Sequence, residues 1–167
     1  FSEGEPHSYQ LPLGIANVLG TNVVSLGVNG GPLTSYTPFN QALRELALDN
    51  ASPARAAIMS PRTQFTVDEL KDTTGQPLQR PKSLESLQMF SSTQVGDSDT
   101  QGSASNASRV FVADYSKLLI GMLQSLQIDV LRESQAHRHQ YELIAHMRCD
   151  VALERPQHFC QIVGIIP

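Results

Sequence analysis

Histidine and cysteine are the side chains of this sequence that could bind a metal ion, and most of them lie in its last third. The candidate ligands are His137, His139, His146, Cys149, His158 and Cys160. On a strand, residues two positions apart share a face, so the first two histidines could hold one ion, and so could His158 with Cys160. No CxxC, HxxxH or HExxH spacing occurs, and Cys149 belongs to the apolar positions of its segment. We therefore expect surface histidines and no metal site.

Patterns typical of catalysis are missing from the sequence. There is no G-x-S-x-G, and the serine-rich stretches have no base at a defined spacing. Asp68 and Glu69 are adjacent on a predicted helix, so their carboxylates point to different sides. No glycine-rich stretch has phosphate-loop spacing. We expect no catalytic or cofactor-binding residues, no cofactor and no enzymatic activity.

Charge and length argue against several classes of protein. The chain has 12 basic and 16 acidic residues and a net charge of −4, without the clustered Lys and Arg of a nucleic-acid-binding surface. No apolar run approaches the roughly 18 residues of a membrane span. A length of 167 residues suits one domain with a real core. The chain begins at Phe1 without a signal-peptide pattern, and we expect it to be a piece of a longer protein.

The middle of the chain predicts a strand followed by a short helix. Ala56 to Met59 are apolar and have strand length. Ser60 is a good helix N-cap and Pro61 suits the first helical position. Thr66 with Glu69 offers a second capping box, so the sequence allows a helix start at either place.

An earlier helix and a polar loop flank this unit. Thr37 to Asn50 has apolar residues at helical spacing, with Pro38 at the first position, and its stripe should lie in the core. The stripe consists of Phe39, Ala42, Leu43, Leu46 and Ala47. Gly96 to Ser108 is rich in Gly, Ser, Asp and Asn and predicts a mobile, exposed loop.

The last third predicts strands. From Tyr141 to Leu153 the odd positions are apolar and the even ones mostly polar, which is typical of one long strand with its odd face buried and its even face exposed. Further strands are expected at 109–114, 128–133 and 159–166, while 115–124 fits a helix or an extended segment. Cys149 and Cys160 should be buried, unlinked thiols of a reducing environment.

Three strings of the sequence carry a resemblance to a known family. The first runs from Gly4-Glu5-Pro6 to Pro12-Leu13-Gly14-Ile15-Ala16-Asn17, and the second is MSPRT at 59–63 with LKDTTGQPL at 70–78. The third extends from Arg109 to Arg155-Pro156 and the apolar strand beyond. In this order they resemble the tailed-phage major capsid proteins of the Hong Kong 97 type, weakly between Thr93 and Ser108.

The resemblance implies an α+β fold, the Hong Kong 97-type capsid fold in part: a mixed or antiparallel sheet with flanking helices and long terminal strands. Residues 1–127 would be the axial domain and 128–167 the terminal strands of the peripheral domain, with the N-terminal arm, extended hairpin and spine helix absent. Contacts between subunits are expected at the loops Gly27–Tyr36, Asp72–Gln79 and Gly96–Ser108.

Some capsid proteins of this type join their subunits by a Lys–Asn isopeptide bond that a Glu assists. His139 and His146 occupy the positions that match this Asn and Glu. The resemblance therefore does not extend to this chemistry.

The implied function is structural: a major capsid subunit of a tailed phage or prophage that assembles into an icosahedral shell around double-stranded DNA. It would be made in the bacterial cytoplasm and reside in the virion. Its partners would be other copies in pentamers and hexamers, then scaffolding, protease, portal or decoration proteins, without specific nucleic-acid or membrane binding. The alternatives are an encapsulin-type nanocompartment shell of the same fold and, in a different class, a metal- or ligand-binding α+β domain.

Overall fold

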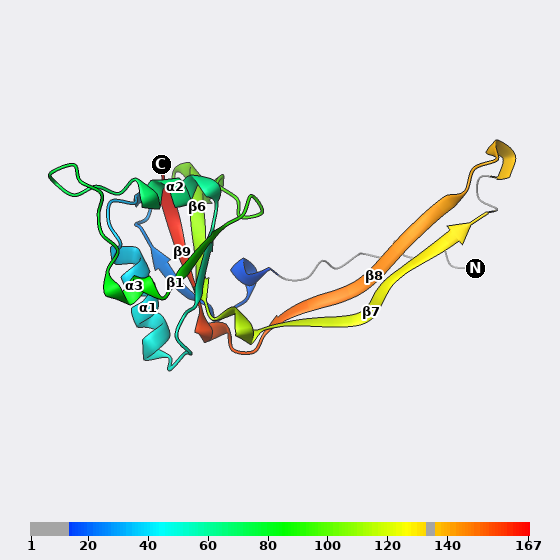
Figure 1. Ribbon diagram of the computed structural model, residues 1–167, viewed down its shortest axis with the longest axis horizontal. Coiled ribbons are helices and arrows are strands. Elements are labelled where there is room, and N and C mark those ends of the chain that lie inside the picture. Colours follow the sequence, from blue (N-terminus) through cyan, green and yellow to red (C-terminus); the bar gives the residue numbers. More distant parts are fainter. Residues whose placement is uncertain (1–13, 133–135) are drawn as a thin grey trace.

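The computed structural model describes residues 14–132 and 136–167, and it has two parts: a sheet with helices packed on it, and a long two-stranded ribbon that projects from the sheet (Figure 1). The strand order of the seven-stranded sheet is β1-β9-β6-β3-β4, with β2 paired to β9 and β5 to β6. These strands are β1 (Asn22–Ser25), β2 (Gly31–Pro32), β3 (Ala56–Met59), β4 (Gln88–Ser91), β5 (Asp99–Gln101), β6 (Ala104–Ala113) and β9 (Phe159–Ile166). Because β9 is parallel to β1 and antiparallel to β6, the sheet is mixed, which confirms the predicted class.

The helices of the described residues are short. They are α1 (Thr37–Leu48), α2 (Pro61–Asp68) and α3 (Lys82–Glu85), with 3-10 turns η1 (Ile15–Asn17), η2 (Tyr115–Lys117), η3 (Ala136–Arg138) and η4 (Pro156–His158). The backbone N–H of Thr63 donates to the Ser60 hydroxyl at 3.4 Å, so α2 begins at Pro61 and the alternative start at Thr66 is wrong. None of these helices is long and apolar enough to cross a membrane.

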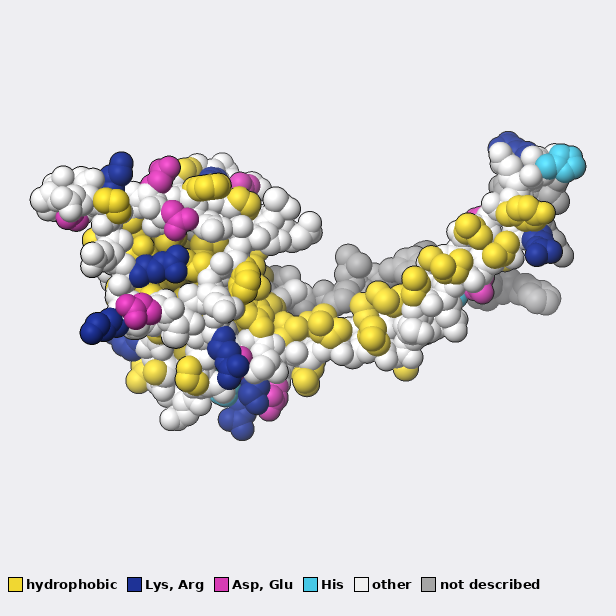
Figure 2. Space-filling model, viewed as in Figure 1, with side chains coloured by type: hydrophobic (Ala, Val, Ile, Leu, Met, Phe, Trp, Pro, Cys, Tyr) yellow, Lys and Arg dark blue, Asp and Glu magenta, His cyan; other side chains and the backbone are white. Residues whose placement is uncertain are grey.

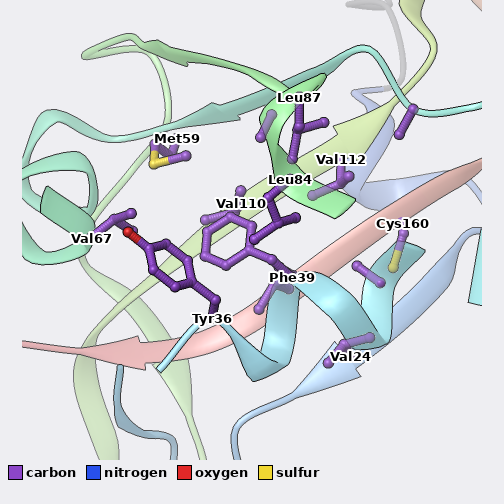
Figure 3. Packing of buried hydrophobic residues seen from close by; sticks show 14 of the residues in the cluster. Val24, Tyr36, Phe39, Met59, Val67, Leu84, Leu87, Val110, Val112 and Cys160 are labelled. Atoms are coloured by element: carbon purple, nitrogen blue, oxygen red, sulfur yellow. The ribbon is translucent and has the colours of Figure 1, made fainter. Parts of the chain in front are cut away.

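A hydrophobic core lies between the sheet and the helices. Phe39 from α1, Leu84 from α3 and Val110 from β6 converge there without solvent exposure (Figure 3). Met59 of β3 and Val67 of α2 are equally buried. The core therefore joins elements from residue 24 to residue 165 into one body.

Two expectations for this body are wrong. Ala47, predicted to be part of the buried stripe of α1, is exposed, although Phe39, Ala42 and Leu46 are buried. Gly96–Ser108, predicted to be a mobile, exposed loop, is largely exposed, but it contains β5 and the start of β6 paired as a hairpin. Its order rests on polar contacts, because Arg109 donates to the Asp99 carboxylate and the buried Ser108 hydroxyl lies 2.6 Å from that of Thr63. A polar composition does not report such contacts.

The ribbon consists of β7 (Leu118–Leu131) and β8 (Glu142–Leu153), paired antiparallel along their length. The predicted long strand is thereby confirmed as β8. Residues 115–124, which fitted a helix or an extended segment, form the 3-10 turn η2 and the start of strand β7. Ala113 pairs with Phe159 at the end of the β6–β9 pair, and Leu118 pairs with Leu153 at the start of the ribbon. The ribbon is therefore an excursion between two neighbouring strands of the sheet.

These strands divide the last third differently from the expected boundary at residue 127. β9 lies in the sheet between β1 and β6, whereas β8 belongs to the ribbon, which already begins at Leu118. Residues 128–167 are thus shared between the two parts. How these parts correspond to axial and peripheral domains stays a prediction.

Candidate assembly surface

Charged side chains interact at the point where the ribbon leaves the sheet. Asp114 is buried, accepts a hydrogen bond from the Ser116 backbone N–H at 3.2 Å, and lies 3.8 Å from the Arg55 guanidinium. Burial raises the pKa of this carboxyl, but the hydrogen bonds from Ser116 and the charges of Arg55 and Lys117 outweigh burial and hold the pKa below its usual value. Lys117, at the end of η2, also forms an ion pair with Glu154, just after β8, at 3.1 Å.

An aromatic contact strengthens the same junction. The Tyr115 ring packs edge-on against Phe159 with 6.1 Å between the ring centres, and its hydroxyl donates to the Phe111 carbonyl at 3.2 Å. Burial raises the pKa of Tyr115, so it remains a neutral donor. The base of the ribbon is therefore anchored on the strands β6 and β9.

Beyond this base, the paired residues on one face of the ribbon are all apolar. Directly paired residues of an antiparallel ribbon lie on the same face, so the register defines the set. The apolar face includes Leu118, Ile120, Met122, Ile128 and Val130 of β7 and Leu143, Ala145, Cys149, Val151 and Leu153 of β8. Met147 shares this face by the alternation of side chains along β8. These side chains form a band along the ribbon (Figure 2).

The apolar face is uncovered, which overturns the expected burial of the odd positions of 141–153. Leu143 is 67% exposed and Met147 52% exposed, and just the end near the sheet is half-buried. The predicted alternation of apolar and polar side chains between the two faces of β8 was correct, but no other described segment packs on the apolar face.

The opposite face of the ribbon carries polar groups that satisfy one another. This face, here called the polar face, contains Gln124, Gln127 and Asp129 of β7 and Glu142, His146, Arg148 and Asp150 of β8, and also four apolar residues: Leu119, Leu131, Ile144 and Ala152. His146 lies 3.6 Å from the Asp129 carboxylate and 3.2 Å from the Gln124 amide. The Gln124 amide also donates to Gln127 at 2.6 Å. This face is suited to water, and the contrast between the faces makes the ribbon amphipathic.

The candidate metal ligands are not brought together. Within the described ranges, no group of three or more His, Cys, Asp or Glu side chains could hold an ion. His137 and His139 are exposed at the far end of the ribbon, and His146 lies partway along it. His158, expected at the surface, is instead buried near the sheet, and its Nδ1 has no hydrogen-bond partner among the described residues.

The two cysteines differ in environment, and neither is in a disulfide. Cys160 is buried in β9 as predicted, and burial together with the negative charge of Glu45 raises its pKa to about 12. Cys149, predicted to be buried, is exposed because it lies on the uncovered apolar face. A hollow of about 400 Å³ lies on the ribbon at Cys149. It is lined by Gly121, Met122, Leu123, Arg148, Cys149 and Asp150.

Two of the three loops expected at subunit contacts, Asp72–Gln79 and Gly27–Tyr36, differ in exposure. Asp72–Gln79 is almost fully exposed, and its turn is held by the Asp72 carboxylate, which accepts from the Thr74 and Gln76 backbone N–H groups at 2.8 and 3.0 Å. These hydrogen bonds, led by the one from the Thr74 hydroxyl, lower the pKa of Asp72. Gly27–Tyr36 instead includes β2 and the buried residues Leu33 and Tyr36.

Comparison with known proteins identifies the family. The phage capsid family matches residues 4–164 of the sequence. The chain belongs to this family. No curated protein matches the sequence.

Solved structures agree with this family in fold. The capsid of Myoviridae phage XM1 superposes with a TM-score of 0.68 at 12% identity, over 93% of this chain and 55% of that one. The capsid of a native GTA particle gives 0.65 at 15% identity, over 93% and 56%. Mycobacterium phage Ogopogo gives 0.60 at 18% identity, over 91% and 56%. The chain spans about half the length of the solved structures it matches.

Proposed function

We propose that this chain is the shell-forming part of a major capsid subunit of a tailed phage or prophage. In this role it assembles with other copies into an icosahedral shell around double-stranded DNA, and the virion is its location. The observation that carries the proposal is the match to the phage capsid family over residues 4–164. The role is structural and requires no catalytic or cofactor-binding residue.

The geometry suits such a role. A rigid body with one core presents exposed loops, and a ribbon extends from it with an apolar face that needs a cover (Figures 1 and 2). Repeated contacts between identical subunits close rings and shells when each subunit offers surfaces of this kind. The Asp72–Gln79 loop, held in shape by its own hydrogen bonds, is the most exposed of the expected contact loops.

An encapsulin-type shell is the second reading of the same fold. The match of the phage capsid family over residues 4–164 favours the phage reading.

Electron microscopy of the purified full-length protein tests the proposal. Closed icosahedral shells are expected, and shells from infected or induced cells should contain double-stranded DNA. Soluble monomers at every concentration would contradict the assembly role. Shells filled with a protein cargo instead of DNA would favour the encapsulin reading.

A further inference from the structure

Two of the three loops expected at subunit contacts touch each other. They are Gly27–Tyr36 and Gly96–Ser108, here called the first and the second contact loop. The backbone N–H of Ser103 in the second loop donates to the side-chain oxygen of Asn29 in the first at 3.2 Å, across 74 residues of sequence. The Gln101 carboxamide donates to a backbone carbonyl of the first loop, also at 3.2 Å. Contacts over such a sequence distance depend on the tertiary fold, so each loop helps to hold the other in place.

The end of β9 lies between the two contact loops. On one side, the strand β2 of the first loop pairs with Ile165 and Ile166. On the other side, the Ser108 hydroxyl of the second loop donates to the Ile165 carbonyl at 3.3 Å. Ile165 itself is buried in the core. The last residues of β9 therefore connect both loops to the body.

Glycine stands at two of the closest approaches between these segments. Gly164 has a φ of +83°, and a Cβ there would lie 3.1 Å from the Gly30 Cα and 3.2 Å from the Gln101 Cγ. Gly102 has a φ of +56°, and a Cβ there would overlap the Asn29 side chain. Both backbone conformations and both close approaches favour a residue without a side chain. The sequence therefore supplies glycine where the three segments must come together.

The glycine junction, the meeting point of residues 27–31, 101–103 and 164–166, carries no charged side chain. Val28 in its first turn is 85% exposed. Charged residues are depleted at the centres of protein interfaces, because removing a charge from water costs free energy. Binding also costs free energy when it must order a loop, and these loops are already held by contacts within the chain. The junction is therefore suited to contact another protein.

We propose that the glycine junction makes the two contact loops and the end of β9 one cooperative unit, which a neighbouring subunit meets as a single preordered surface. The cooperative unit is a property of this chain alone, whereas the neighbouring subunit as its partner rests on the proposed function. Loosening of any one of the three segments should loosen the other two.

Hydrogen exchange of the 167-residue chain, measured for single amides by NMR, tests the cooperative unit. Gly164→Ala crowds Gly30 and Gln101. It should speed exchange of the Gly30 and Ser103 amides, one in each loop, at least about tenfold. The Gln88 amide, which is bonded at 2.9 Å in another part of the sheet, should keep its rate.

Gly75→Ala is the matched control, because Gly75 has the same φ of +83° but a Cβ there would meet no atom of the described chain within 4 Å. It should leave the Gly30 and Ser103 amides unchanged. Gln101→Ala adds no atom and decides the question if Gly164→Ala does not fold. Loss of its hydrogen bond to the first loop should speed exchange of the Gly30 amide at least about threefold. Faster exchange in one loop alone, or equally throughout the chain, would overturn the cooperative unit.

Hydrogen exchange measured by mass spectrometry on shells of the full-length protein tests the contact. Peptides that cover 27–31 and 101–103 should exchange at least about tenfold more slowly in the shells than in the dilute chain, and both should be slowed together. Protection of neither peptide, or of one alone, in well-formed shells would overturn the shared surface and leave the capsid role intact. Absence of shells would contradict the proposed function and with it the partner, whereas the exchange rates of the single chain still decide the cooperative unit.

Discussion

Removal of the ribbon should leave the sheet folded, because the chain leaves and re-enters the body at adjacent positions. The variant deletes residues 118–153 and joins Lys117 to Glu154 with a short Asn-Gly turn. These two residues are already neighbours, since the Glu154 N–H donates to the Lys117 carbonyl at 3.1 Å and their side chains form an ion pair. The register of β6 and β9 ends at Ala113 and Phe159, before the cut.

The size of the effect follows from loop closure. The deletion shortens the connection between Ala113 and Phe159 by roughly three- to fourfold. Because each doubling of loop length costs about 0.6 kcal/mol in closure entropy, the shorter connection favours folding by about 1 kcal/mol. Loss of the half-buried contacts of Leu118, Val151 and Leu153 near the base acts in the opposite direction by a similar amount. The free energy of unfolding should therefore stay within about 1 kcal/mol of that of the parent.

Urea unfolding at a concentration where the parent is monomeric measures this free energy, with circular dichroism as the probe. One cooperative transition with a smaller m-value is expected, because less surface becomes exposed on unfolding. A loss of cooperativity, or a loss of more than about 3 kcal/mol, would refute the view that the sheet is a self-sufficient unit.

Three further outcomes follow from the same structure. Phe39→Ala should lower the free energy of unfolding by about 3–5 kcal/mol, whereas Phe65→Ala, at a ring that is 67% exposed, should change it by less than about 0.5 kcal/mol in the same urea titration. The Asp114 carboxyl has a lowered folded pKa, so its contribution is complete above the unfolded pKa of about 3.9 and disappears as the pH falls through the folded value. Asp114→Asn should therefore cost about 1–2 kcal/mol at pH 7 and little at pH 2, and an equal cost at both pH values would contradict this. Met147→Asp should change the unfolding free energy of the dilute monomer by less than about 1 kcal/mol, as scanning calorimetry can test, since its side chain is already in water.

Local chemistry made much of the body predictable. Ala56–Met59, the cap at Ser60 and Pro61, and Phe159–Ile166 occur with the predicted bounds, because strand length, capping and proline placement are properties of neighbouring residues. The hairpin within Gly96–Ser108 was missed because polar contacts over long sequence distances, such as that of Ser108 with Thr63, leave no trace in composition.

The ribbon shows where periodicity stops being informative. Alternation in 141–153 correctly gave one strand with two unlike faces, but it cannot tell a covered face from an uncovered one. Whether a face is covered depends on whether another helix or sheet packs on it, and the sequence of the strand itself does not show this. A usable signal was present in 118–131, a second apolar segment of similar length joined by a short polar connection, which is typical of a two-stranded hairpin. Its ambiguous helical spacing concealed this signal.

The alkylation rate of Cys149 tests most directly whether the apolar face of the ribbon is an assembly surface. The measurement compares the dilute chain with assembled particles of the full-length protein, with Cys160 as the internal unreactive control. We predict rapid labelling of Cys149 in the dilute chain and strong protection in the particles. Equal labelling in both states would mean that assembly leaves this face in water, and would contradict the account.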